Sequence, residues 1–502
     1  MREVAGERRH LRAVARGSAA TLAGAVISTL AGFGLVLVVT RSVTPDTAGR
    51  FFAVTAVFLV ALAAAGLGTD TGLARFVLRD DRPEAVRALV RTAAVPVLAT
   101  AVLLALALGL WWPDARALMW ALPLAAATDL CLAAVRAHAL FRATVLIDRI
   151  VRPAVQIAFV AVAILLDLPG AGLAAAWGAA YAVSAVLALG SLRHVVGRGR
   201  RGAGAGAGAA RDDAVVGRRE YWRFTAPRAI ARIAQVGVQR LDIVLVAWLL
   251  SPTDAAVYTV ATRFVVFGQL ANQAVSSVVQ PRFTMILATE ADDAPALVSR
   301  VFGVSTCWSV LLAWPVYLAV AAAPAAYLGW FGTSYTKGEA VVVAVVMAAG
   351  MLLAVASGPV DTLLLMTGRS GLSLANTLVA LALDVGLCLL LVPRIGIAGA
   401  AVAWVVAVVV RCVLAVLQLR ADIGLRLPVA DLVLAAALPI GCVGVPVALL
   451  ALVAGLSPFG WLVATAVAGL GYAAVVWRLR TRLAVDVFVT GFRSRRRLAV
   501  AA

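Results

Sequence analysis

The chain has 502 residues, of which 63% are hydrophobic and 14% are charged, and its mean hydropathy is +0.99. This much apolar surface excludes a soluble globular protein. The net charge of +19 would be compatible with nucleic-acid binding. However, most arginines fall in alternate loops between apolar stretches, as the positive-inside rule predicts for a membrane protein. We therefore expect a membrane protein that contacts anionic lipid headgroups and has no nucleic-acid partner.

Fourteen stretches have the length of a membrane span, which needs roughly 20 apolar residues. Their apolar runs are continuous and do not alternate, so they predict helices and not barrel strands. The arginine asymmetry predicts a multi-pass protein of the cell (cytoplasmic) membrane with both termini in the cytoplasm. The expected spans are 18–40, 50–70, 88–110, 116–137, 151–167, 172–193, 226–250, 255–280, 299–323, 340–366, 372–392, 398–419, 430–453 and 458–478.

The segment between the sixth and seventh spans is rich in glycine, alanine and arginine. It has no apolar face to bury and is expected to be a flexible cytoplasmic linker. This linker divides the chain into an N-terminal lobe, the linker itself, a C-terminal lobe, two additional helices and a basic cytoplasmic tail, at 1–196, 197–220, 221–425, 426–480 and 481–502.

Two short patterns occur once in each lobe. Pro45–Phe51 and Pro252–Tyr258 both read P-x-x-A-[GA]-x-aromatic, and Ala171–Trp177 and Ala398–Trp404 both read A-G-x-A-x-A-W. They appear in the same order at matching places, which indicates an internal repeat. Repeats of six spans have the same orientation in the membrane and predict a pseudo-two-fold axis along its normal, with a site between the lobes.

These turns and helix starts, together with Gln239–Asp242 and Pro393–Ala401, resemble the oligosaccharide and polysaccharide flippases of the multidrug/oligosaccharidyl-lipid/polysaccharide exporter superfamily. The resemblance covers most of the chain. It implies an all-α membrane protein with two pseudo-symmetric six-helix lobes and two added C-terminal helices, which moves lipid-linked sugars across the cytoplasmic membrane. It also implies that the first two helices of each lobe line a central cavity.

Polar side chains at bilayer depth usually face a bundle interior or a watery cavity. The span 226–250 carries five of them at spacings of three and four, which places them on one helix face, and the span 255–280 adds several amides. With Arg75 at the inner end of the second helix, the candidate substrate-binding residues are Arg75, Arg228, Arg232, Gln235, Gln239, Gln269, Asn272 and Gln273.

We expect the arginines to bind a diphosphate, because guanidinium donors match phosphate oxygens, and the amides to bind sugar hydroxyls. The alternative is that the arginines extend to the headgroups while the amides join neighbouring helices. Asp242 and Asp384 are candidates for ion coupling. Asp384 has an alternative role as the neutralising partner of Arg411, and Ser357–Pro359 is a candidate hinge or a static kink.

No cofactor or metal site is expected: the five cysteines lie inside predicted spans without metal-ligand spacing, and no phosphate-binding loop for ATP is present. We expect no enzyme but a flippase for a polyprenyl-diphosphate-linked oligosaccharide or cell-envelope precursor, acting by alternating access. Other polysaccharide-assembly membrane proteins are further expected partners.

Three alternatives remain open. A multidrug or organic-cation antiporter of the same superfamily would be expected to carry an acid in its first helix, and 18–40 contains none. A membrane-embedded polyprenyl-dependent glycosyltransferase would want acids on a sizeable outer loop, where the longest loop offers only Glu339. A non-transporting scaffold should tolerate neutralisation of the polar residues.

Overall fold

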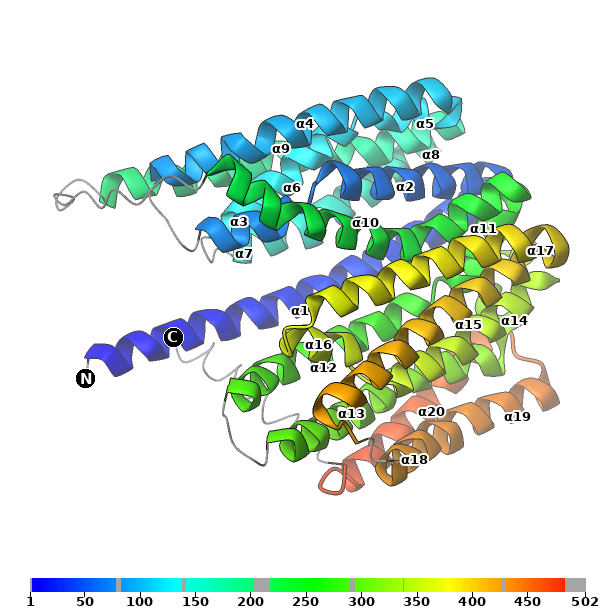
Figure 1. Cartoon of the computed structure of the whole chain (residues 1–502). Coiled ribbons are helices and arrows are strands. Elements are labelled where there is room, and N and C mark those ends of the chain that lie inside the picture. Colours follow the sequence, from blue (N-terminus) through cyan, green and yellow to red (C-terminus); the bar gives the residue numbers. More distant parts are fainter. Residues whose placement is uncertain are drawn as a thin grey trace. The chain divides into compact units, whose positions relative to one another are not determined.

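All regular elements of the described residues, which are 2–77, 83–137, 141–202, 217–288, 294–336, 338–426 and 429–483, are helices in the computed structural model (Figure 1). In the first part of the chain they are α1 Arg2–Ser42, α2 Pro45–Ala65, α3 Thr69–Val77, α4 Pro83–Trp111, α5 Pro113–Met119, α6 Leu122–Ala137, α7 Phe141–Thr144, the π-helix η1 Val145–Val151, α8 Arg152–Leu165, α9 Gly170–Gly202 and α10 Arg218–Leu249.

The rest of the chain continues with α11 Pro252–Thr262, α12 Val265–Ala288, α13 Ala294–Ala322, α14 Pro324–Leu328, the 3-10 helix η2 Thr333–Tyr335, α15 Glu339–Ala356, α16 Val360–Met366, α17 Ser370–Ile423, α18 Val429–Pro439, the π-helix η3 Ile440–Gly444, α19 Val445–Ala454 and α20 Pro458–Arg478. The expected linker 197–220 falls mostly outside the described residues, as does most of the expected tail.

Nine helices or continuous helix pairs of the described chain are long and apolar enough to cross a membrane, and ten if the bent pair α5–α6 is one span. One of them, α17, holds two of the fourteen expected spans. The other three expected spans correspond to η1–α8, α10 and α11–α12. Each of these is helical, but α8 is short and α10 and α11–α12 carry polar side chains that lower their hydropathy. The protein is therefore an all-helical, multi-pass integral membrane protein.

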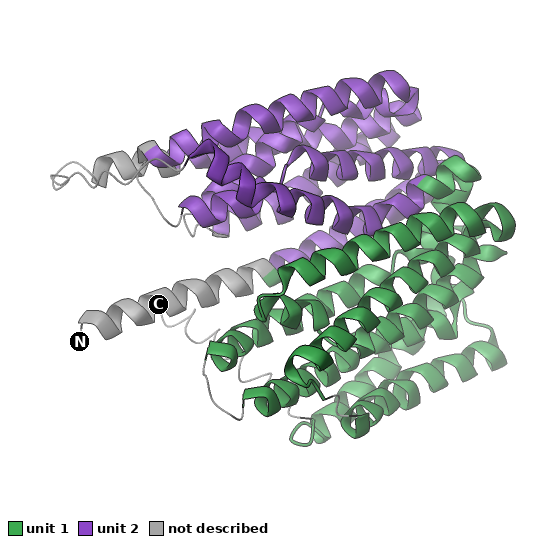
Figure 2. Ribbon diagram, viewed as in Figure 1, with its two compact units in different colours: residues 1–22, 245–502 green, residues 23–244 purple. Residues whose placement is uncertain are grey.

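The chain forms two compact units (Figure 2). Residues 23–244, drawn in purple as unit 2, come first in the sequence and are called the first unit below; residues 1–22 and 245–502, drawn in green as unit 1, are called the second unit. In the first unit α9 packs against α6 and α8, and α6 also packs against α3 and α4. Phe58 of α2 fills the space beside α9, with its ring 5.5 Å from Trp177 and 5.3 Å from Tyr181. The tryptophan of the first A-G-x-A-x-A-W pattern is thus a core residue.

In the second unit α13 is the central helix, packed against α12, α15 and α18. The two helices expected as an addition to the lobes also dock on α13: the Tyr472 hydroxyl of α20 donates to the Leu311 carbonyl (2.8 Å), and the Trp461 indole N–H donates to the Ala319 carbonyl (2.9 Å). The outer faces of α19 and α20 expose large apolar side chains such as Leu452 and Leu470, as lipid contact requires.

The repeated P-x-x-A pattern is a helix start in both units. Thr44 and Ser251 cap α2 and α11, each accepting a hydrogen bond from the backbone N–H three residues later. Proline follows as the first helical residue, where its missing N–H costs nothing. The small residues of the pattern and its final aromatic residue are buried in both copies. The pattern therefore encodes a capped start and the packing of the first turn.

The long helix α17 is two helices joined at a kink. Ile395 and Gly396 depart from helical geometry, and Gly396 has φ +63° and ψ −150°, a conformation that glycine adopts without a steric penalty. The freed backbone N–H of Ile397 donates to a carboxylate oxygen of Glu339 at 2.8 Å. The acid of the longest expected outer loop is thus a helix cap in this structure.

Candidate functional site

The polar residues of α10 divide into an accessible group and a buried one. Arg232, Gln235 and Gln239 are exposed and Arg228 is half-buried, whereas Asp242 is only 5% exposed. The Asp242 carboxylate accepts a 2.8 Å hydrogen bond from the backbone N–H of Ile243. The accessible face of α10 is therefore cationic and amide-bearing, and Asp242 belongs to the packed interior.

Two arginines expected to bind phosphate, Arg75 of α3 and Arg228 of α10, lie on the same aromatic ring. Their guanidinium carbons are 4.2 Å and 3.5 Å from the ring centroid of Phe224, which is within the range of cation–π attraction. One N–H group of Arg228 also donates to the Phe224 carbonyl at 2.7 Å. The ring and this bond hold both positive charges in one place, which we call the arginine pair.

The close approach of α3 and α10 depends on two glycines. A Cβ atom at Gly68, where φ is +68°, would lie 2.7 Å from the backbone nitrogen of Ala229, and one at Gly72 would lie 2.7 Å from the Thr225 hydroxyl. Any side chain at these positions would push the helices apart and separate the arginines. The G-x-x-x-G spacing of Gly68 and Gly72 is a known helix-contact pattern and is the sequence signal for this contact.

The arginine pair has no acidic partner among the described residues, since none of their ion pairs involves Arg75 or Arg228. Other arginines of the same unit do have partners: Arg50 bonds Asp46 at 2.8 Å and Asp114 at 2.9 Å. Two like charges near one ring repel each other, and an anion bound close to both relieves that repulsion. The arginine pair is thus suited to bind a phosphate or diphosphate.

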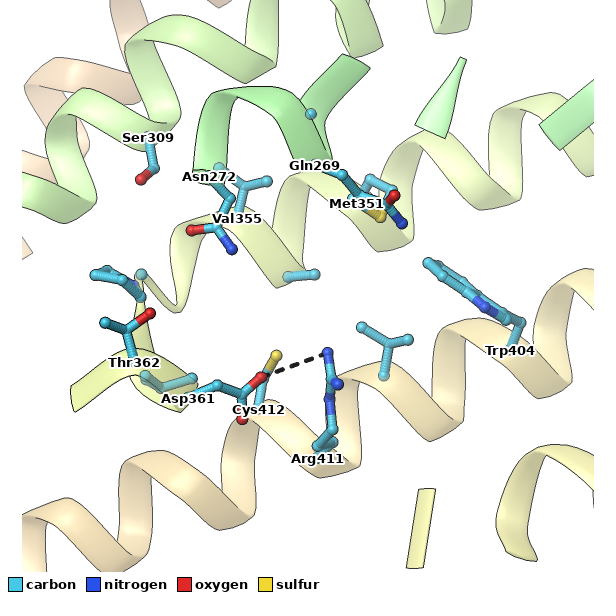
Figure 3. Close-up of a pocket in the computed structure, with 16 residues that line it drawn as sticks. Gln269, Asn272, Ser309, Met351, Val355, Asp361, Thr362, Trp404, Arg411 and Cys412 are labelled. Carbon is cyan, nitrogen blue, oxygen red and sulfur yellow. Dashed lines mark ion pairs between the residues drawn. The ribbon is translucent and has the colours of Figure 1, made fainter. Parts of the chain in front are cut away.

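A cavity of about 130 Å³ lies within the second unit, between α12, α15, α16 and α17. Figure 3 shows Gln269 and Asn272 reaching into it from α12, and Asp361, Arg411 and Trp404 facing them across the space. Two of the three candidate amides of α12 therefore face a real cavity. Gln273 is exposed but does not line it.

Arg411 forms an ion pair with Asp361, with nitrogen and oxygen 3.7 Å apart. The alternative in which Arg411 neutralises Asp384 is therefore replaced by a different pair. Asp384 is completely buried, and its carboxylate accepts a weak hydrogen bond from the Cys388 thiol at 3.9 Å. Asp361 reaches Arg411 because α16 packs against α17, a contact that helix periodicity does not reveal.

The break between α15 and α16 lies at Ser357–Pro359. Gly358 has φ +77°, and a Cβ atom there would lie 2.2 Å from the Thr306 hydroxyl of α13. After the break, Thr362 faces the cavity and its hydroxyl donates to Ser276 of α12 at 3.2 Å. The expected hinge position is thus where the chain changes direction to supply Asp361 and Thr362 to the cavity wall.

A charged network that the sequence did not single out lies around Arg152 in the first unit. One guanidinium nitrogen lies 2.8 Å from Asp148, and another donates to the Tyr181 hydroxyl at 3.0 Å. Asp129 of α6 interacts electrostatically with this group and with Arg232. Asp148 lies in η1, and π-helical turns often occur at functional sites; such a turn has no simple sequence signature.

Within the described chain, no group of three or more histidine, cysteine, aspartate or glutamate side chains is placed to hold a metal ion. The five cysteines are free. The functional elements that remain are the arginine pair with the accessible face of α10 in one unit, and the polar cavity in the other.

These features define a class: an all-helical, multi-pass membrane protein. In comparisons with solved structures, a lipid II flippase MurJ in an inward closed conformation superposes with a TM-score of 0.68 at 10% identity, covering 93% of this chain and 99% of the flippase. An inward-facing multidrug resistance MATE transporter of the MOP superfamily gives a TM-score of 0.55 at 14% identity, covering 82% and 94%.

A MOP superfamily transporter from Pyrococcus furiosus gives a TM-score of 0.52 at 16% identity, covering 82% of this chain and 95% of that protein. No model of a protein family matches the sequence, and a search of curated protein sequences finds no match. The protein therefore has the fold of the MOP superfamily transporters, and these structural neighbours are transporters and not enzymes.

Proposed function

We propose that the protein is a flippase that moves a polyprenyl-diphosphate-linked sugar or cell-envelope precursor across the cytoplasmic membrane by alternating access. The observation that carries the proposal is the arginine pair, two guanidinium groups on one ring with no acidic partner among the described residues. A diphosphate is the part of such a lipid that needs this chemistry. The likeness to a lipid II flippase supports the same class of substrate.

The proposal gives each part of the substrate a binding partner. The diphosphate would bind Arg75 and Arg228, with Arg232 close along α10. The amides of α10 and α12 would bind head-group hydroxyls, and the lipid tail would stay in the bilayer against exposed apolar side chains. Rocking of the lobes would expose the head group to either side. Asp242 and Asp384 stay as proposed ion-coupling residues.

The multidrug antiporter is the second candidate, because MATE transporters share the fold. The arginine pair disfavours it, since two guanidinium groups with no acidic partner among the described residues would repel a cationic drug. The glycosyltransferase is disfavoured because Glu339, the acid that it would need, already caps the second half of α17. We therefore retain the flippase.

The test replaces Arg75 and Arg228 together by glutamine. A charge-assisted hydrogen bond contributes about 1.5–3 kcal/mol, so export of the lipid-linked sugar should fall at least roughly tenfold. The measurement is the ratio of lipid-linked sugar on the inner and outer leaflets of cells that depend on the variant.

The matched control is R282Q/R300Q, which removes the same charge from two exposed arginines of α12 and α13. It should export normally. Normal export by R75Q/R228Q at wild-type protein levels would contradict the proposal.

A further inference from the structure

The walls of the cavity in the second unit carry no net charge. Asp361 and Arg411 neutralise each other, and the other polar side chains that line the space are uncharged: Gln269, Asn272, Ser309 and Thr362. Such a site offers donors and acceptors in roughly equal number but holds no excess charge for an ion. It is therefore suited to a neutral, polar molecule.

The ion pair at the base of the cavity is loose. Its 3.7 Å separation exceeds the 2.7–3.2 Å typical of a direct N–H···O hydrogen bond. By comparison, Arg152 approaches Asp148 to 2.8 Å. Asp361 and Arg411 therefore keep hydrogen-bonding capacity, and a hydroxyl group between them can accept from the guanidinium and donate to the carboxylate at once.

One aromatic side chain, Trp404, lines the cavity and is 7% exposed. Trp404 faces the space from the second half of α17, across from Met351 of α15 (Figure 3). In the other unit the tryptophan of the same sequence pattern, Trp177, packs on Phe58 and Tyr181. An indole beside convergent polar groups fits a ring that has apolar C–H faces and a polar rim. The C–H face can pack on the indole while the hydroxyl groups of the rim bond to the polar side chains.

The size of the cavity limits the ligand to a small one. Its volume of about 130 Å³ is below the roughly 300 Å³ at which sites for drug-sized ligands begin. It has room for one small ring of a ligand.

From these observations we infer that the cavity between α12, α15, α16 and α17 binds one uncharged sugar ring of the transported head group, stacked on Trp404 and held through its hydroxyls by Asp361, Arg411 and Asn272. The inference rests on the proposed function and adds a sugar-selective subsite to it. The diphosphate and the sugar are thus recognised by different groups of residues.

The experiment measures binding of undecaprenyl diphosphate, with and without a single attached sugar, to the purified protein in detergent by native mass spectrometry. The sugars are glucose, galactose and N-acetylglucosamine. The wild-type protein should prefer at least one sugar-bearing lipid over the bare diphosphate lipid by tenfold or more. W404L and D361N should reduce that preference to about onefold and bind the bare lipid as the wild-type protein does, and W404F should retain part of it.

The matched control is W111L, since Trp111 is 87% exposed at the end of α4; it should keep the full preference. An unchanged preference in both W404L and W404F, or no preference in the wild-type protein, would overturn the subsite. Equal affinity for the free methyl glycoside would assign the cavity to a soluble sugar and overturn it as well. Failure of the wild-type protein to bind any diphosphate lipid would instead count against the proposed function.

Discussion

At the scale of single residues, one carboxylate serves two helix starts. Glu339 is the first residue of α15, and its side chain also accepts the Ile397 N–H at the start of the second half of α17. Both helix N-termini carry partial positive charge, which a carboxylate stabilises. Gly396 makes the contact feasible, because a Cβ atom there would lie 2.2 Å from a Glu339 oxygen.

Replacing Glu339 should therefore lower the stability of the second unit in two steps. E339Q keeps a hydrogen-bond acceptor but loses the charge, for a cost of about 0.5–1 kcal/mol, and E339A loses both, for about 1–2 kcal/mol. The measurement is the thermal unfolding midpoint of the purified protein. The control D167N changes an exposed acid in a connection between helices and should melt like the wild-type protein, whereas an unchanged midpoint for E339A would refute the double-cap role.

In the first unit, two glycines bring the two arginines of the arginine pair together. The sequence identifies both arginines of the pair as candidate binding residues, but it does not predict that they contact the same aromatic ring. Arg75 and Arg228 are 153 positions apart and come together because Gly68 and Gly72 let α3 approach α10. Phe224, one helical turn before Arg228, then completes the arrangement.

At the scale of elements, breaks in helices place polar groups where continuous helices could not. The break between α15 and α16 directs Asp361 and Thr362 into the cavity, and the kink of α17 separates the half that contains Asp384 from the half that contains Trp404 and Arg411. A freed backbone group in a membrane must find another partner. Glu339 supplies one at the kink in α17.

The break at Gly358 provides a test at this scale. G358A places a Cβ atom against Thr306 and forces alanine into a left-handed backbone conformation, which together should cost about 1–3 kcal/mol. We expect a lower thermal unfolding midpoint than that of the wild-type protein. The control G386A alters a glycine of α17 that has no atom within 4 Å of its added Cβ and should leave the midpoint unchanged or raise it. Equal midpoints for the two variants would show that the break tolerates a side chain.

At the scale of the whole molecule, the distribution of arginines predicts which loops face the cytoplasm. The loop that contains Ser334 carries few charges and is expected outside, whereas Gly217 lies within the arginine-rich linker 197–220 and is expected inside. Both positions are exposed and suit a chemical test.

Single cysteines at these two positions, in a variant without the five native cysteines, should react differently with a membrane-impermeant maleimide on intact cells. S334C should be labelled at once, and G217C only after the membrane is made permeable. Labelling of G217C on intact cells would reverse the proposed orientation of the protein, and with it the side from which the lipid-linked sugar enters.

Composition and periodicity alone determined that the chain lies in a membrane, that it is helical, and where most of its spans lie, because burial in lipid demands continuous apolar helices whatever the packing. The repeated motifs also marked the starts of α2 and α11, whose caps only the structure shows. The sequence identified the polar residues of α10 and α12 and offered Asp384 as an alternative partner of Arg411, which the structure pairs with Asp361. It missed Trp404 as a cavity-lining residue and the network around Arg152. Those features arise from helix breaks and from contacts between residues far apart in the chain. They depend on which helix faces which, and only tertiary packing decides that.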